Sequence, residues 1–154
     1  MVNVTWRLFQ STDLPFFQDV ISDSGKWRKI ELKDAKLIHY INQYDDLAGE
    51  WRIWEWEGGC PVAISYHLDS APSNQKAWIG TILVKASERR KGIANTIINE
   101  LASELKGKGH RAIFAGVPIE EYEWSNFLSD CGFEQFKSEE NKGETFLVMV
   151  RPID

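Results

Sequence analysis

The chain has 154 residues, a formal net charge of −5 and a composition that is 43% hydrophobic and 27% charged. This length fits one domain, and the hydrophobic content argues against a disordered chain. Because phosphate contacts need a basic face, an acidic chain is a poor general nucleic-acid binder. We therefore expect one folded domain over residues 1–154 that has no nucleic-acid partner.

The N-terminal third predicts one strand followed by two helices. Residues 3–9 are typical of a strand, and residues 13–20 and 33–46 are typical of helices. Residues 22–29 contain Ser-Asp-Ser-Gly and are expected to form a loop. The second helix has one apolar face with helical spacing, formed by Leu37, Ile38, Ile41 and Tyr44.

The middle of the chain predicts a hairpin and a third strand. Residues 50–57 and 60–69 are typical of strands, and Gly58-Gly59 between them suits a tight turn. Alternate positions of the return strand place four apolar residues on one face: Val62, Ile64, Tyr66 and Leu68. Residues 77–84 are apolar throughout, so we expect a strand that is buried on both faces.

The C-terminal half begins with a helix over residues 93–106, which carries an apolar stripe and ends at Gly107 and Gly109. The remaining elements are a strand at 111–117, a helix at 119–131 and a hairpin of 132–138 and 144–150 that turns at 141–143. The order is therefore strand, two helices, three strands, helix, strand, helix and two strands. It predicts a mixed α/β (α+β) domain rather than a doubly wound one.

No membrane span, signal peptide or metal site is expected. The longest apolar runs, such as 112–119, fall short of the ~18 residues that a membrane span needs. The N-terminus lacks a basic stretch followed by an apolar one. Cys60 and Cys131 stand apart from each other and from any histidine pair, which fits neither a zinc site nor a disulfide framework. The simplest expectation is a reduced, cytoplasmic protein.

The segment that carries chemistry is 82–94, where an apolar strand leads through a basic loop and Gly92 into a helix. The first-turn N–H groups of a helix have no internal partners and lie at the positive end of its dipole, so they bind phosphate. Gly92 permits a positive φ and a close approach by a ligand. The alternative is an ordinary strand–helix turn with a solvated basic tip. The sequence lacks both the P-loop pattern Gly-x-x-x-x-Gly-Lys-Ser/Thr and a Gly-x-Gly-x-x-Gly after a strand. Nucleotide hydrolysis and a Rossmann dinucleotide site therefore lack support.

Two motifs in this chain resemble the GNAT superfamily of N-acetyltransferases. The first is Arg89-Arg90-Lys91-Gly92-Ile93-Ala94 after Leu83-Val84, and the second is the helix 126–131 that runs into Gly132-Phe133. The resemblance extends over the element order from about residue 3 to 150. It implies a GNAT-like acyl-CoA acyltransferase fold, with a central, mostly antiparallel sheet and helices on both faces.

The resemblance also implies residue roles. Acetyl-CoA would be the acyl-donor substrate, no metal would be needed, and a primary amine would be the acceptor. Backbone amides of the loop would hold the CoA pyrophosphate, from Arg89, Arg90, Lys91, Gly92, Ile93 and Ala94. Backbone groups of Ile82, Leu83 and Val84 would pair with the pantetheine arm where the fourth and fifth strands splay apart.

The chain departs from the family pattern at its catalytic positions. A Tyr that protonates the leaving thiolate is common where this chain has Leu128, an Asn is common at Glu121, and a Glu base is common at Trp78. A base must still deprotonate the ammonium acceptor. The candidates are Tyr122, His67 and Glu55.

Each of these candidates has a structural alternative: Tyr122 at the surface or in packing, His67 in the core, and Glu55 on a solvated face. Glu57 and Asp69 are further candidates for the base on the same hairpin.

Tryptophan is abundant, with seven in the chain. Aromatic walls attract cations, so an acceptor pocket could be lined by Trp27, Trp51, Trp54, Trp56 and Tyr66. Because neighbouring residues face opposite sides of a strand, Trp51 cannot share a face with Trp54 and Trp56, and some of these rings must be core.

Three functions remain open: an acetyltransferase of a small amine, a catalytically weak CoA-binding sensor or partner-binding module, and a protein or peptide acetyltransferase. The sequence also leaves a monomer and a homodimer open.

Overall fold

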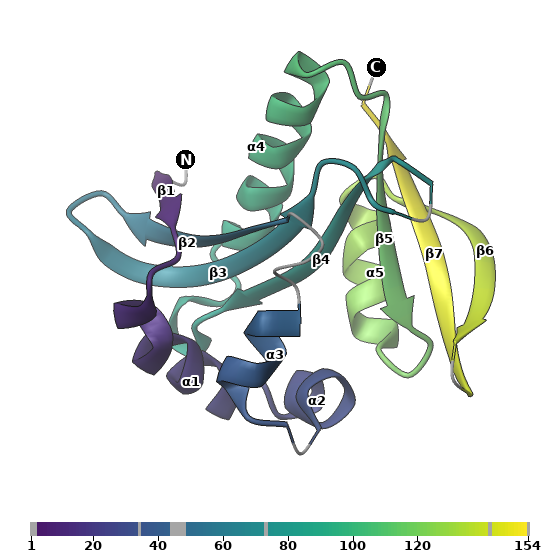
Figure 1. Cartoon of the computed structure of the whole chain (residues 1–154). Coiled ribbons are helices and arrows are strands. Elements are labelled where there is room, and N and C mark those ends of the chain that lie inside the picture. The colour runs from purple at the N-terminus through teal and green to yellow at the C-terminus, as the bar shows by residue number, and fades with distance from the viewer. Residues whose placement is uncertain (1–2, 34, 44–48, 73, 142, 154) are drawn as a thin grey trace. The chain divides into compact units, whose positions relative to one another are not determined.

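The computed structural model of the protein describes residues 3–33, 35–43, 49–72, 74–141 and 143–153. Within these ranges, seven strands form a sheet in the order β1-β2-β3-β4-β5-β7-β6 (Figure 1). The pairing is antiparallel for β1–β2, β2–β3, β5–β7 and β6–β7, and parallel for β4–β5. The prediction of a mixed α/β fold with a mostly antiparallel sheet is confirmed.

The described chain divides into two compact units. The first comprises Met1–His67 and Thr81–Ile97, and the second comprises Leu68–Gly80 and Ile98–Asp154. Strand β4 (Ala77–Val84) and helix α4 (Ile93–Gly107) contribute residues to both units.

The first unit begins with an antiparallel meander of three strands. β1 (Val4–Leu8) pairs with β2 (Glu50–Trp56), which pairs with β3 (Cys60–Leu68). The turn between β2 and β3 contains Gly58 and Gly59 with φ of 107° and 93°, which glycine adopts without steric cost. All three strands and this turn were predicted.

Strand β3 is more buried than its alternation suggested. Val62, Ile64 and Tyr66 of the apolar face are buried as expected and Leu68 is half-buried, but Ala63, Ser65 and His67 on the opposite face are at most 2% exposed. The Ser65 hydroxyl accepts a hydrogen bond of 2.8 Å from the Trp54 indole, so this buried polar pair is satisfied. β3 is therefore a central strand with both faces covered.

The helices of the first unit are α1 (Leu14–Ser22), α2 (Gly25–Trp27), a π-helical stretch (Arg28–Leu32) and α3 (Leu37–Gln43). The predicted loop over 22–29 is wrong, because Trp27 and Leu32 are buried and hold this polar segment in helical turns. Helix α3 is shorter at its start than the predicted 33–46, since Lys33 has a φ of 56°. The expected Tyr44 lies outside the described residues.

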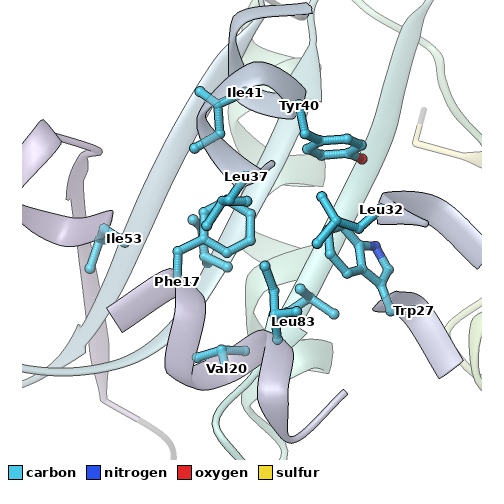
Figure 2. Close-up of a cluster of buried hydrophobic side chains, with 11 residues drawn as sticks. Phe17, Val20, Trp27, Leu32, Leu37, Tyr40, Ile41, Ile53 and Leu83 are labelled. Atoms are coloured by element: carbon cyan, nitrogen blue, oxygen red, sulfur yellow. The ribbon is translucent and has the colours of Figure 1, made fainter. Parts of the chain in front are cut away.

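These helices pack against β2 and β3 through one apolar cluster (Figure 2). Phe17 of α1 and Leu37 of α3 meet Ile53 and Ile64 of the sheet, and Leu83 of β4 completes the cluster. Each of these side chains is at most 8% exposed, and burying a side chain of this size contributes about 1.5–3 kcal/mol. On α3, Leu37 and Ile41 are buried as predicted, whereas Ile38, which was expected on the same face, is 47% exposed. It follows Leu37 directly and therefore points about 100° away around the helix.

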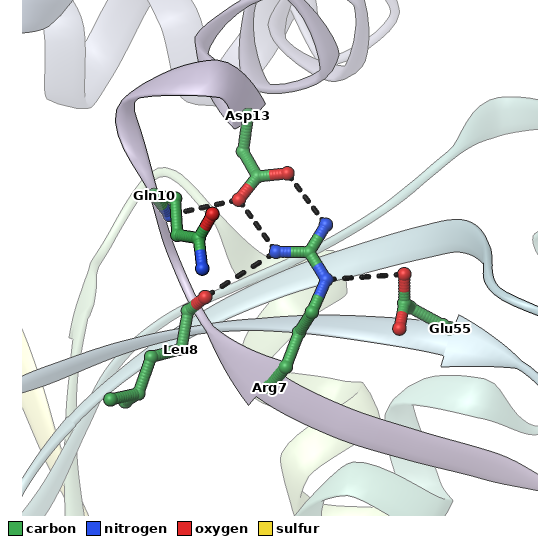
Figure 3. A network of polar contacts seen from close by, with 5 residues as sticks. All are labelled: Arg7, Leu8, Gln10, Asp13 and Glu55. Carbon is green, nitrogen blue, oxygen red and sulfur yellow. Dashed lines mark hydrogen bonds and ion pairs between the residues drawn. The ribbon is translucent and has the colours of Figure 1, made fainter.

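A polar network fixes the chain between β1 and α1 (Figure 3). The Arg7 guanidinium donates to both carboxylate oxygens of Asp13, each at 2.7 Å, and to Glu55 at 3.2 Å. The Gln10 N–H also donates to Asp13, at 2.8 Å. The hydrogen bonds from Arg7 and then from Gln10 lower the pKa of the buried Asp13 carboxyl.

The second unit contains β5 (Ala112–Pro118), α5 (Tyr122–Asp130), β6 (Glu134–Asn141) and β7 (Glu144–Pro152). All four were predicted, although α5 begins later than residue 119, because 119 and 120 form a turn after β5. The pairing of β4 with β5 comprises Ala77–Ile79 and Ile113–Ala115. No described helix combines the length and apolar character that a membrane crossing requires.

Candidate functional site

The predicted acyl-CoA loop lies in the first unit, between the end of β4 and the start of α4. A 3₁₀ turn (Ala86–Glu88) leads into it, and two of its residues are left-handed, Arg90 with a φ of 63° and Gly92 with a φ of 80°. A left-handed arginine is uncommon and strained, a state that functional loops often contain. Left-handed residues in a loop turn successive N–H groups towards a common point, which is the geometry of an anion-binding nest.

Helix α4 begins directly after this loop. The Gly92 carbonyl accepts hydrogen bonds from the Thr96 N–H at 3.0 Å and the Thr96 hydroxyl at 2.9 Å, so Gly92 caps the helix. The N–H groups of the first turn have no intrahelical acceptors, and the helix dipole adds positive potential there. The loop and the helix start thus direct backbone donors and partial positive charge at one place.

The three cationic side chains of the loop differ in their contacts. Arg89 donates from Nε to the Val84 carbonyl at 3.0 Å and from Nη2 to the Ser24 hydroxyl at 2.9 Å. The Lys91 ammonium contacts the Glu88 carboxylate at 3.1 Å. Arg90 is exposed at the surface. The sequence had treated these cations as equivalent.

Glu88 is the carboxylate next to this loop. It accepts hydrogen bonds from Lys91 at 3.1 Å and from the Trp56 indole at 3.0 Å. The Lys91 ammonium, and to a smaller extent the Trp56 indole, lower the pKa of the Glu88 carboxyl. Trp56 therefore helps to fix the Glu88 carboxylate next to the loop, a contact that no sequence pattern indicated.

The strand residues expected beside the pantetheine arm are largely covered. Ile82 and Leu83 are each 8% exposed, and Leu83 belongs to the apolar cluster. The carbonyl of Val84 accepts from Arg89, and the N–H of Lys85 donates to the Val62 carbonyl at 2.8 Å. The peptide group between Val84 and Lys85 is thus held on both sides by the protein.

Two of the candidate catalytic residues, Glu55 and His67, lie at opposite ends of the β2–β3 hairpin. Glu55 is engaged by Arg7 and pairs with Pro61 near the hairpin turn, whereas His67 pairs with Glu50 at the other end of the same hairpin. His67 is 2% exposed, which agrees with its core interpretation. Tyr122, at the start of α5 in the second unit, is 61% exposed.

The structure also places the other residues that the sequence analysis named, Glu57, Asp69 and Leu128. Glu57 is exposed next to the hairpin turn, and Asp69 forms an ion pair of 2.7 Å with Lys108 in the second unit. Leu128, at the position of the family's tyrosine, is fully buried in α5.

Phe17 contacts Trp27 and Trp51, and Trp51 contacts Tyr66, so these four rings of the first unit form one packed cluster. Trp27 and Tyr66 are at most 9% exposed, and Trp54 is fully buried. Trp51 lies 4.7 Å from Tyr66 and 5.3 Å from Phe17, measured between ring centroids. These separations are typical of aromatic pairs in a core, so most of these rings are core rather than walls of an acceptor pocket.

A basic loop with two left-handed residues and a helix start whose first-turn N–H groups lack intrahelical acceptors form a candidate anion-binding site. The sequence model of the Acetyltransferase (GNAT) family matches residues 6–133 of this chain. The chain belongs to the GNAT family and is an acetyltransferase, as the two motifs predicted.

Relatives agree with this membership. The uncharacterized protein YkzC of Bacillus subtilis (strain 168) is 47% identical over 128 residues, which cover 82% of this chain and 89% of that protein. The spermidine N-acetyltransferase from Vibrio cholerae in complex with CoA and spermine has a TM-score of 0.74 at 16% identity, covering 97% of this chain and 95% of its own. A protein provisionally described as a phosphinothricin N-acetyltransferase has a TM-score of 0.73 at 16% identity, covering 99% of both chains. These two solved structures establish the shared fold.

Proposed function

We propose that this chain, as one domain, transfers the acetyl group of acetyl-CoA to the primary amine of a small molecule. The observation that carries the proposal is the pair of left-handed residues, Arg90 and Gly92, directly before the capped start of α4. Backbone N–H groups and a helix N-terminus together bind phosphate oxygens. The CoA pyrophosphate supplies such oxygens.

The residues of the loop and of the preceding strand would bind different parts of acetyl-CoA. Backbone amides from Arg89 to Ala94 bind the pyrophosphate, and the side chains of Arg90 and Lys91 add positive charge around it. Ile82 and Leu83 offer backbone groups to the pantetheine arm. The Val84 carbonyl is already an acceptor for Arg89, so the pantetheine contacts fall on the remaining polar groups of this strand segment.

The reaction is an acyl transfer. The lone pair of the neutral amine attacks the thioester carbonyl carbon, the new C–N bond forms, the C–S bond breaks, and CoA leaves as a thiolate. The amine loses its proton to solvent or to a side-chain base, and the thiolate leaves unprotonated or takes a proton from water. Thiol pKa values of about 8–9 make this a tolerable leaving group without a dedicated acid.

Positioning and charge stabilisation would then supply most of the rate. An amide of β4 near Val84 is the proposed donor to the carbonyl oxygen as negative charge develops on it, an effect that is usually the largest single contribution. Leu128 cannot donate a proton, and Tyr122 is exposed at the surface. The pH dependence should therefore follow the deprotonation of the amine.

The acceptor is proposed to be cationic at neutral pH. The chain carries a net charge of −5, and an acidic protein attracts ammonium groups to its surface. The solved structures that share the fold include a spermidine acetyltransferase and a protein described as a phosphinothricin acetyltransferase, so both compounds belong in a substrate panel.

The test is turnover with acetyl-CoA and a panel of small amines, followed by thiol release. Acetylation of at least one amine above the rate of acetyl-CoA hydrolysis would support the proposal. Acetylation of lysines or N-termini in a peptide library, with no small amine consumed, would show that the acceptor is a protein or a peptide. Release of CoA with no amine acetylated would refute amine acetylation.

A further inference from the structure

The side chain of Arg89 links three parts of the first unit. Its Nε donates to the last carbonyl of β4, at Val84, over 3.0 Å, and its Nη2 donates to the Ser24 hydroxyl over 2.9 Å. Ser24 lies 65 residues earlier in the chain, between α1 and α2. A planar guanidinium can make both bonds at once because its donors are fixed in a fork, which an ammonium lacks.

The hydrogen bonds of Ser24 orient its hydroxyl oxygen as an acceptor for Arg89. It is 9% exposed, its hydroxyl donates to the Val20 carbonyl at 2.8 Å, and its N–H donates to the Ile21 carbonyl at 2.9 Å. A hydroxyl has one hydrogen to donate, so its bond to Arg89 must be an accepted one. The Arg89 cation therefore lies beside the last carbonyls of α1, where the helix dipole favours positive charge.

The same guanidinium fixes the peptide that follows β4. The Val84 carbonyl is held by Arg89 and the Lys85 N–H is held by Val62 at 2.8 Å, so this peptide plane cannot rotate without losing both bonds. The loop that contains the left-handed Arg90 and Gly92 starts five residues after Val84. A rotation of this peptide would change the direction of the amides that follow.

We propose that Arg89 is a positioning residue that couples acyl-CoA binding to the order of the turn between α1 and α2. This inference rests on the proposed function of the loop. Arg89 acts through Val84 and Ser24 and leaves Arg90 and Lys91 as the cations that face the ligand. Bound acyl-CoA stabilises the loop. The hydrogen bonds of Arg89 to Val84 and Ser24 then also stabilise residues 20–28.

The primary test compares Arg89→Lys with Arg28→Lys. Arg28 is exposed and its backbone N–H donates to the Ser24 carbonyl, so Arg28→Lys removes a nearby guanidinium at the same net charge. Loss of one hydrogen bond of about 1 kcal/mol corresponds to a change of about fivefold. We expect Arg89→Lys to raise the KM for acetyl-CoA about fivefold or more while kcat changes less than about twofold. Arg28→Lys should leave both constants unchanged. An unchanged KM in Arg89→Lys would overturn the inference.

A second measurement reports on coupling rather than on general damage. Hydrogen exchange in residues 20–28 should slow when the wild-type protein binds acetyl-CoA, and this protection should be smaller in Arg89→Lys. Equal protection in both proteins would contradict the coupling.

Ser24→Ala removes the hydrogen bond between Arg89 and the Ser24 hydroxyl while leaving Arg89 in place. It keeps the inference testable if the Arg89 variant fails to fold. Its effect on KM should not add to that of Arg89→Lys, and additive effects would show that the two residues act independently. If the wild-type protein shows no binding of acetyl-CoA, the proposed function fails. If the wild type binds and the variants bind equally well, only the role of Arg89 fails.

Discussion

The network around Asp13 gives the most quantitative prediction of stability. In Asp13→Asn, the carboxylate that joins β1 to α1 becomes a neutral amide of the same size. The carboxylate accepts two bonds of 2.7 Å from Arg7 and one of 2.8 Å from the Gln10 N–H. The amide keeps one acceptor oxygen and directs its N–H₂ group at the guanidinium or at the Gln10 N–H.

The size of the effect follows from burial. A hydrogen bond to a charged group contributes about 1.5–3 kcal/mol, and three are disturbed here. The Arg7 side chain is 36% exposed and keeps Glu55 as a partner, so solvent screening reduces the loss. We expect Asp13→Asn to lower the free energy of unfolding by about 2 kcal/mol at pH 7. For a domain of this size, that corresponds to a Tm lowered by about 4–8 °C.

The pH dependence provides the check. Arg7 lowers the pKa of Asp13 in the folded protein, so the contribution of this carboxyl is complete above its unfolded pKa of about 3.9 and is lost as pH falls through the folded pKa. Urea unfolding of both proteins should show the full difference at pH 7 and a shrinking one below about pH 4. Asp19→Asn, at an exposed position, should change stability by less than about 0.5 kcal/mol. A difference that stays constant from pH 7 into the acid range would refute the reasoning.

Three further predictions concern packing and mechanism. Gly49→Ala should cost about 1–3 kcal/mol of stability, because the added methyl would overlap the Tyr66 hydroxyl and lie 2.8 Å from a backbone carbonyl. Ser65→Ala should cost about 1–3 kcal/mol in urea unfolding, because it leaves the fully buried Trp54 indole N–H without its 2.8 Å acceptor. Tyr122→Phe should leave the pH–rate profile rising through a single ionisation, because this exposed phenol is not expected to act as the acid.

The two stability variants, Gly49→Ala and Ser65→Ala, each have a matched comparison. Gly25→Ala introduces the same methyl where no atom lies within 4 Å, and it should be neutral or stabilising. Ser138→Ala removes a hydroxyl from the exposed strand β6 and should change stability by less than about 0.5 kcal/mol. A loss of the same size in the comparison variant would contradict the packing argument. A bell-shaped profile whose falling limb disappears in Tyr122→Phe would give Tyr122 the acid role.

The sequence predicted the elements whose signal is local. The apolar stripe of α4, the paired glycines at the β2–β3 turn and the strand–loop–helix motif at 82–94 all depend on residues close in the chain. The segment 22–29 was misread because its polar residues suggest a loop, whereas burial of Trp27 makes it helical. Tertiary packing overrides local preference in such segments.

The candidate site shows the same division. The loop residues follow from their spacing, but the commitment of Arg89 to Ser24 depends on a contact across 65 residues, and that of Glu55 to Arg7 on one across 48. No pattern in the sequence marks such partners. The hydrogen bond between Trp56 and Glu88 was not predicted for the same reason, since it joins residues 32 positions apart.

Calorimetric titration of acetyl-CoA tests the central claim most directly, using the wild type, Gly92→Glu and Gly109→Glu. Both variants add the same charge at a glycine with positive φ, but Gly109 lies beyond the end of α4 with no atom within 4 Å of an added Cβ. We predict micromolar binding by the wild type, similar binding by Gly109→Glu, and at least about tenfold weaker binding by Gly92→Glu, or ~1.4 kcal/mol. Equal affinity in all three proteins would place the pyrophosphate elsewhere, and no binding by the wild type at millimolar acetyl-CoA would contradict the proposed function.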